Sequence, residues 1–266
     1  MAEFVNITES DAVATVTITR ESLHNAFNEV VIDELTAAFR DLSESESARV
    51  VILASEGKSF SAGADIHWMK RMVDYSYDEN IRDANTMADM LRAIRECSKP
   101  TIARVHGATF GGGVGLTAAC DVAVAVESAV FCLSETKLGI APAVISPYVM
   151  EKIGPGPMRR YALTAERFDA REACRLGLIS DFVATAEELD PWIAKVSHEI
   201  LQVSPNAVAV CKPLLNEVAG LHWDRVQEIT TAGIAGLRVS EEGQEGLHAF
   251  LEKRKPAWSP EAQAKA

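Results

Sequence analysis

The chain alternates between two hydrophobic periodicities, and this alternation restricts the possible folds more than any other feature. Apolar residues recur at every second position over residues 12–20, which is the pattern of a strand. They recur at helical spacing over residues 31–42, and the runs RVVILAS and TIARVHG that follow predict two buried strands. Between these runs, Ser76 and Glu79 have capping-box spacing and predict a helix that ends before Pro100. Strands that alternate with helices predict an α/β domain.

The character of the chain changes near residue 190. From about Glu187 onward, helical patterns follow one another in the segments AEELDPWIAKVSHEILQ, SPNAVAVCKPLLNEVAG, WDRVQEITTAGIAGLR and EEGQEGLHAFLEKRK. We therefore predict an α/β core over residues 1–190 and a helical section over residues 191–266. The 266 residues, of which 48% are hydrophobic, are enough for one large core with an appendage.

Charge and composition exclude several classes of protein. A net charge of −12 without a basic stripe argues against a nucleic-acid surface. No apolar run approaches the roughly 20 residues of a membrane helix, and the start MAEFVNITES lacks the features of a signal peptide, so we expect a cytoplasmic protein away from membranes. Five widely spaced cysteines, with no C-x-x-C and no histidine grouping, predict reduced thiols and no metal site.

Two glycine-containing stretches each follow a predicted buried strand and precede a predicted helix: FSAGADI, Phe60–Ile66, and FGGGVGL, Phe110–Leu116. Because glycine has no side chain, such a stretch allows either a tight turn or the close approach of another group to the main chain. Gly113, Gly115 and Ala118 also match G-x-G-x-x-A, but two strand–helix passes precede the match, which disfavours a dinucleotide site. A structural turn and an anion site at the start of a helix remain open. If the negative charge arises only during a reaction, the two stretches together predict an oxyanion hole.

These two stretches, followed by CDVAVAVESAVFCLSETKLGIAP and the ending GLHAFLEKRKPAW, resemble the crotonase superfamily of enoyl-CoA hydratases and isomerases. The resemblance extends from the first strand pair to about Trp258. It implies a spiral of ββα units with a core of two sheets, and a C-terminal helical section that packs against neighbouring subunits in a trimer or a hexamer of two trimers. It also implies an acyl-CoA thioester substrate and no separate cofactor. The segments SAGADIHWMKRM, SPYVMEKIG and RRYALTAERFDAREA are most similar to bacterial methylglutaconyl-CoA hydratases of leucine degradation.

The resemblance also assigns roles to individual residues. The thioester oxygen would lie between the backbone N–H groups of Ala64 and Gly112, and Glu135 in LSETKLG would be the catalytic carboxylate. The remaining substrate contacts would come from Ala62, Gly111, Gly115 and Ser134, from Asp65 and Ile66, from His24 and Ala26 on the opposite wall, and from Phe250 and Lys253 beside the adenine and phosphate of CoA. For Asp65, capping of the helix that begins there is the alternative interpretation.

One position departs from the family pattern. Family hydratases carry two glutamates, whereas this chain has Glu135 at the second position and Gly115 at the first. A single carboxylate can act as base or acid but constrains a water molecule less than two. We predict hydration of methylglutaconyl-CoA or a related branched enoyl-CoA, and a 3-enoyl to 2-enoyl CoA isomerase remains the alternative. If the substrate bears a carboxylate, Lys137, Arg159 and Arg160 are the candidate cations.

A non-catalytic, RNA-binding relative is the third possibility. One relative in the superfamily binds RNA through a lysine-rich helix. The matching segment of this chain, NEVVIDELTAAFRDL, contains acidic residues and no lysine. We therefore expect no nucleic-acid partner.

Overall fold

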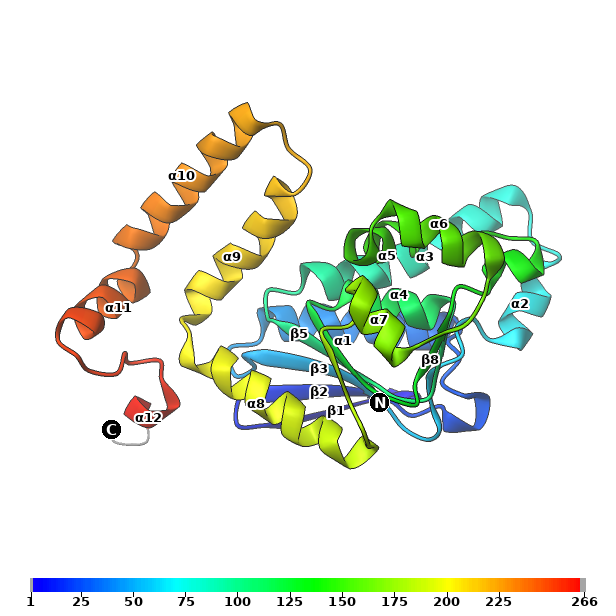
Figure 1. Ribbon diagram of the computed structural model, residues 1–266, viewed down its shortest axis with the longest axis horizontal. Helices are drawn as coiled ribbons and strands as arrows, with labels where there is room; N and C mark the ends of the chain where they lie inside the picture. The colour runs from blue at the N-terminus through cyan, green and yellow to red at the C-terminus, as the bar shows by residue number, and fades with distance from the viewer. Residues whose placement is uncertain (1, 264–266) are drawn as a thin grey trace.

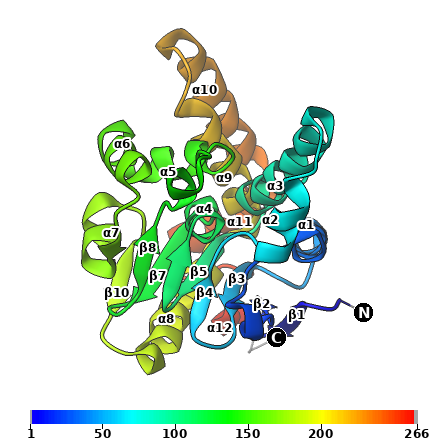
Figure 2. The ribbon, with the colours of Figure 1, turned by 90° about the vertical axis from the view of Figure 1, so that its right-hand side faces the viewer.

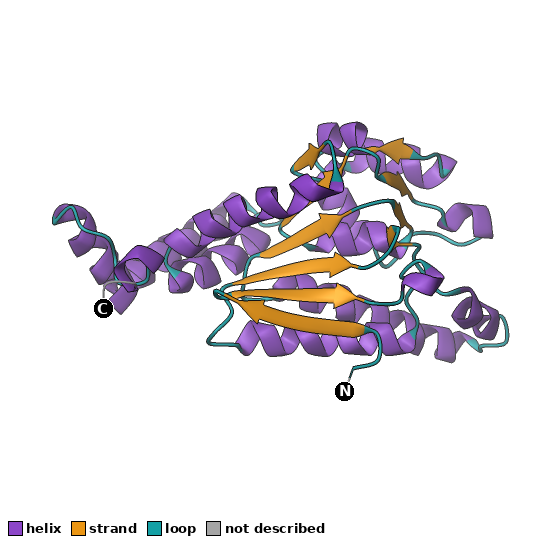
Figure 3. Cartoon of the chain, turned by 90° about the horizontal axis from the view of Figure 1, so that it is seen from below, coloured by secondary structure: helices purple, strands orange, loops and turns teal. Residues whose placement is uncertain are grey.

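The computed structural model describes residues 2–263, and its strands form two sheets (Figures 1 and 3). The larger sheet contains, in spatial order, β1 (Val5–Ser10), β2 (Val13–Ile18), β3 (Val50–Ser55), β5 (Thr101–Val105), β7 (Val122–Val126) and β10 (Asp181–Val183). The smaller sheet contains β4 (Ser59–Ser61), β6 (Ala108–Phe110), β8 (Val130–Cys132) and β9 (Phe168–Asp169). Only the β1–β2 and β8–β9 pairs are antiparallel among the strands of residues 2–263.

Helices account for most of the remaining residues. Those of the body are α1 (Glu29–Glu44), α2 (Ile66–Met72), α3 (Tyr77–Glu96), α4 (Gly112–Ala119), α5 (Ser146–Ile153), α6 (Pro155–Thr164), α7 (Ala170–Leu176) and α8 (Leu189–Gln202). They are followed by α9 (Pro205–Val218), α10 (Trp223–Val239), α11 (Glu241–Leu251) and α12 (Pro260–Gln263). Three short 3-10 turns are η1 (Glu21–Leu23), η2 (Glu135–Leu138) and η3 (Ala186–Glu188).

The chain repeats a β–β–α unit, as predicted. β3 continues into β4 and α2, β5 into β6 and α4, and β7 into β8 and η2, so the two strands of each unit lie in different sheets. β4 and β6 are parallel neighbours in the small sheet. Because parallel strands end at the same edge of a sheet, the two glycine-containing bends that follow them lie side by side.

Both faces of the large sheet are covered, which explains why every residue of β3 is buried. The main core lies between the sheet and the helices α1, α3 and α4. A smaller cluster lies between the opposite face of the sheet and α8. Figure 1 shows α8 below the sheet and α1 and α4 above it. The predicted helical spacing is confirmed in α1, where Val31, Leu35 and Leu42 are buried.

The C-terminal segments form the predicted helices. The proposed division at residue 190 falls at the start of α8, but α8 packs on the sheet. Helices α9, α10 and α11 then extend away from the body as an arm (Figures 1 and 3). Within residues 2–263, no helix combines the length and the apolar character needed to cross a membrane.

Candidate active site

The two glycine-containing bends contact each other through their backbones. Gly63 has a φ of +86° and Gly111 a φ of +51°, values that residues with a side chain rarely adopt. A Cβ atom on Gly63 would lie 2.8 Å from the carbonyl oxygen of Phe110 and 3.4 Å from the nitrogen of Gly112. The glycines are therefore required both for the turns and for the close approach of one bend to the other.

The bends present two backbone donors without acceptors. The main chain of Phe27 forms a parallel bridge with Ala64, through hydrogen bonds from Phe27 N to Gly63 O (2.9 Å) and from Asp65 N to Phe27 O (3.0 Å). This bridge uses the residues on either side of Ala64 and leaves the N–H of Ala64 free. Gly112 is the first residue of α4, where the N–H has no partner within the helix. Within residues 2–263, neither N–H donates a hydrogen bond to another residue.

Ala64 and Gly112 both line a cavity of about 490 Å³, which lies at the end of the molecule where α2, α3, α4 and α5 gather (Figure 2). Six predicted site residues line this cavity: Ala62, Ala64, Gly111, Gly112, Ser134 and Glu135. Sequence reasoning missed other lining residues, among them Phe27, Trp68, Asp83, Met87 and Ile145. The helical spacing of Asn80, Ala84 and Met87 on α3 is a signal that could have indicated this second wall.

Glu135 begins η2 and directs its carboxylate at the second bend. A Cβ atom on Gly111 would lie 3.2 Å from Oε1 of Glu135. Its Oε2 is buried and accepts no hydrogen bond from any residue in the described part of the chain. Burial raises the pKa of this carboxyl group above its ordinary value. A proton-accepting group therefore lies directly beside the two free N–H donors.

The raised pKa predicts the pH dependence of catalysis. If Glu135 removes a proton in the reaction, it must be ionised, so kcat/KM should fall as the pH drops through its pKa. Because that pKa is raised, the fall should begin at a higher pH than for an exposed glutamate. A pH profile of kcat/KM measures this decrease toward acid pH, and Glu135→Gln should abolish the decrease. Activity that stays constant through the acid range would contradict the prediction.

Ile145 fills the space that the side chain of the first family glutamate would need at position 115. A Cβ atom on Gly115 would lie 2.4 Å from Cγ2 of Ile145. The other acid in the lining is Asp83, whose Oδ1 accepts a hydrogen bond from Nε1 of Trp68 (3.0 Å) and whose pKa is raised by burial. No group of three or more His, Cys, Asp or Glu side chains able to hold a metal occurs within residues 2–263.

Comparison with known proteins agrees with this geometry. Residues 8–261 match the family described as enoyl-CoA hydratase/isomerase. The chain belongs to this family. It is 31% identical to the crotonyl-CoA hydratase of Syntrophomonas wolfei over 256 residues, which cover 95% of this chain and 96% of that protein. The predicted family is thus confirmed, and the chain is an enzyme of the enoyl-CoA hydratase/isomerase family.

Solved structures of the family confirm the predicted crotonase fold. A crystal structure of an enoyl-CoA hydratase from Shewanella pealeana has 42% identity and a TM-score of 0.93, and covers 97% of this chain and 96% of that chain. A crystal structure of an enoyl-CoA hydratase/isomerase from Marinobacter aquaeolei has 31% identity and a TM-score of 0.91. The match covers 96% of this chain and 98% of that chain. Both similarities extend over the body and the C-terminal arm.

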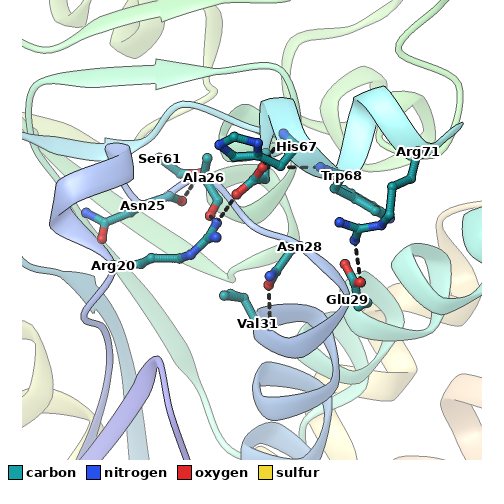
Figure 4. A network of polar contacts seen from close by, with 11 residues as sticks. Arg20, Asn25, Ala26, Asn28, Glu29, Val31, Ser61, His67, Trp68 and Arg71 are labelled. Atoms are coloured by element: carbon teal, nitrogen blue, oxygen red, sulfur yellow. Dashed lines mark hydrogen bonds and ion pairs between the residues drawn. The ribbon is translucent and has the colours of Figure 1, made fainter. Parts of the chain in front are cut away.

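Asp65 is buried and does not belong to the cavity lining. Figure 4 shows its partners Arg20, His67 and Trp68 close together. Its Oδ1 caps α2 by accepting from the N–H groups of His67 (2.5 Å) and Trp68 (3.2 Å). Its Oδ2 pairs with Arg20 Nη1 at 2.5 Å. Burial alone would raise the pKa of Asp65, but Arg20 and the two backbone donors outweigh burial and lower it. Of the two interpretations of Asp65, the structure shows the helix cap.

Removal of Arg20 from its buried pair with Asp65 should strongly destabilise the fold. Both side chains are largely buried, so Arg20→Met leaves an unpaired buried carboxylate and should lower the free energy of unfolding by about 3–5 kcal/mol. Arg92→Met, which breaks the exposed pair with Asp89, is the matched control and should cost about 0–1 kcal/mol. Chemical denaturation of the three proteins measures both effects. Equal losses in the two variants would show that burial of the first pair is unimportant.

The remaining predicted site residues lie outside the cavity lining. His24 contacts the Oγ of Ser59 through its Nδ1 (3.1 Å), Ala26 is buried, and Ile66 is exposed at the start of α2. Phe250 and Lys253 are exposed at the end of the arm, where Figure 1 shows α11 at the opposite end of the molecule from α2.

The cations considered for a substrate carboxylate are also outside the cavity. Neither Lys137, Arg159 nor Arg160 lines it, and Arg160 pairs with Glu166 at 2.6 Å. Among the residues that the structure describes, no lysine, arginine or histidine belongs to the lining.

Proposed function

We propose that this enzyme adds water across the 2,3 double bond of an enoyl-CoA thioester. One observation carries the proposal: the N–H groups of Ala64 and Gly112 line the same cavity as Glu135, and neither N–H nor Oε2 of Glu135 has a hydrogen-bond partner within residues 2–263. Two N–H donors that line one cavity suit an oxygen that becomes negative during the reaction. A buried carboxylate in the same cavity, whose pKa is raised by burial, suits proton transfer to and from the substrate.

Each group has a defined part in the reaction. Glu135 removes a proton from water while the water oxygen bonds to C3 of the acyl group. The electrons of the double bond move toward C2 and the thioester oxygen, where the N–H groups of Ala64 and Gly112 stabilise the enolate. Glu135 then returns the proton to C2. One water molecule has been added, and the carboxylate is regenerated.

The resemblance to methylglutaconyl-CoA hydratases makes methylglutaconyl-CoA the first substrate to test. The largely apolar walls, which include Met87 and Ile145, suit a branched acyl chain. Because no cation belongs to the described lining, a terminal carboxylate would have to reach beyond these walls to a cation or to solvent.

A substrate panel tests the proposed reaction. The purified protein is incubated with 3-methylglutaconyl-CoA, 3-methylcrotonyl-CoA and crotonyl-CoA, and the 3-hydroxyacyl products are identified by mass spectrometry. Hydration of at least one compound is expected, with the branched compounds preferred. Absence of water addition to every 2-enoyl thioester, or release of free CoA, would overturn the hydratase assignment.

Double-bond isomerisation is the second candidate, and the packing of Ile145 on Gly115 favours it. An isomerase needs the oxyanion hole and one carboxylate that moves a proton between C2 and C4, and the position of the first family glutamate holds no acid here. Incubation with a 3-enoyl-CoA separates the two functions. Conversion to the 2-enoyl isomer without hydration of any 2-enoyl-CoA would establish the isomerase.

We also propose that the enzyme assembles as a trimer or as a hexamer of two trimers. The arm exposes large apolar side chains, including Trp223, Val239 and Phe250. Since α11 lies at the opposite end of the molecule from α2, Phe250 and Lys253 would bind CoA at the site of a neighbouring subunit. Light scattering measures the mass of the assembly, and a monomer at micromolar concentration would overturn this proposal.

A further inference from the structure

Phe27 contacts both bends of the candidate oxyanion hole. Its side chain is fully buried, yet it forms part of the cavity wall. Its main chain bonds to Gly63 and Asp65, on either side of Ala64. The first N–H donor is therefore placed by the backbone of Phe27.

The ring of Phe27 meets the second bend. A Cβ atom on Gly112 would lie 2.1 Å from Cζ of Phe27 and 3.1 Å from Cε of Met87. The edge of the ring thus occupies the volume directly beside the first residue of α4. Because protein interiors transmit a change of one methylene to their neighbours, the length of this side chain sets how closely the second bend can approach the first.

The segment that carries Phe27 is held in place against the first bend (Figure 4). Ser61 Oγ donates to the carbonyl oxygen of Asn25 (2.8 Å), and Ala62 N donates to the carbonyl oxygen of His24 (2.9 Å). Arg20 donates to the carbonyl oxygen of Ala26 (2.8 Å). The backbone of Phe27 and the bend at Ala64 therefore form one rigid unit, from which the ring extends to Gly112.

We propose that Phe27 is a positioning residue that fixes the separation of the Ala64 and Gly112 N–H groups. This inference rests on the proposed function, because a separation matters only if both donors bind one oxygen. Such donors must lie about 2.7–3.1 Å from the position of the oxyanion, so a small displacement of either bend weakens one of the two hydrogen bonds. Phe27 itself transfers no proton and forms no bond to the reacting atoms.

Two substitutions change the ring in opposite directions. Phe27→Leu removes its far edge, and Phe27→Tyr adds an oxygen at Cζ, the atom nearest Gly112. The matched control is Phe39→Leu, which changes an equally buried phenylalanine in α1 outside the cavity lining. If Phe27→Leu does not fold, Phe27→Met carries the same test with a side chain of similar volume. Each variant is assayed for kcat and KM with the substrate that the panel identifies.

The second readout is the carbonyl stretch of crotonyl-CoA that is isotopically labelled at its carbonyl carbon. It is measured for the thioester bound in a Glu135→Gln background, which is expected to slow turnover. Hydrogen bonds from both donors lower this frequency relative to the free thioester. We expect the Phe27 variants to lower kcat by about 10- to 100-fold, to change KM by less than about threefold, and to return the frequency toward the free value. The Phe39 control should leave all three values unchanged.

The outcomes separate this inference from the proposed function. Phe27 variants that retain the wild-type kcat and carbonyl frequency, or that lose no more than Phe39→Leu, would overturn the positioning role. If the protein with native Phe27 shows no lowering of the carbonyl frequency and hydrates no enoyl-CoA, the oxyanion hole itself is refuted.

Discussion

Glu135→Gln is expected to lower kcat by about 100- to 10,000-fold, because glutamine cannot accept the proton of the attacking water. KM should change little, since the amide keeps the shape of the side chain and the CoA contacts lie elsewhere. Steady-state kinetics with the preferred enoyl-CoA measure both constants. Glu46→Gln, at an exposed position outside the cavity, is the control and should match the wild type. Retention of more than about a tenth of wild-type kcat by Glu135→Gln would remove this residue from the mechanism.

The same variant should be more stable than the wild type at neutral pH. The folded-state pKa of Glu135 is raised by burial, so the ionised carboxylate destabilises the native state relative to the unfolded chain. This destabilisation disappears as the pH falls through the raised pKa and below the ordinary range of glutamate. The stability difference between the two proteins should therefore shrink in acid, and denaturation midpoints across the pH range measure it.

Gly112→Ala is expected to lower kcat by about 100- to 1,000-fold, because the added Cβ displaces the second N–H donor from the thioester oxygen. The atom would lie 2.1 Å from Phe27 Cζ, so the ring or the bend must move. Overpacking of this kind should also lower the free energy of unfolding by about 1–3 kcal/mol. Steady-state kinetics and chemical denaturation measure the two losses.

A second glycine provides the control for Gly112→Ala. Gly156 lies in α6, and a Cβ atom there meets nothing within 4 Å, so Gly156→Ala should leave kcat unchanged and should not destabilise the protein. In addition, the double variant Gly112→Ala/Phe27→Leu should regain part of the stability lost by Gly112→Ala, because leucine leaves room for the new methyl group. If both glycine variants keep wild-type kcat, the Gly112 N–H takes no part in catalysis.

Local patterns in the sequence predicted most of the architecture. Val31, Leu35 and Leu42 recur at helical spacing and are buried in α1, and Ser76 with Glu79 forms the predicted capping box of α3. These predictions succeed because the face of a helix and the bonding of its first turn depend on residues three or four positions apart. One local detail was missed: Ala12, at the start of the predicted strand pattern, lies in a turn with a φ of +62° before β2.

Local sequence patterns predicted only part of the candidate site. The glycines at residues 63 and 111–113 marked both bends, and the family resemblance indicated Ala64, Gly112 and Glu135 as the candidate donors and base. The sequence by itself thus determined the alternation of strands and helices and the two glycine bends, and its family motifs indicated the ββα units and the candidate groups of the site. Both depend on short motifs that fold over a few consecutive residues.

Tertiary structure alone decided how these groups are arranged. It places the ring of Phe27 against Gly112 and Ile145 against Gly115, and it commits Asp65 to Arg20. Each contact joins residues that lie between 30 and 85 positions apart, where no periodicity links one to the other. The separation of the two N–H donors and the occupancy of the missing glutamate position therefore follow from how side chains fill a shared volume, which is a property of the packed fold.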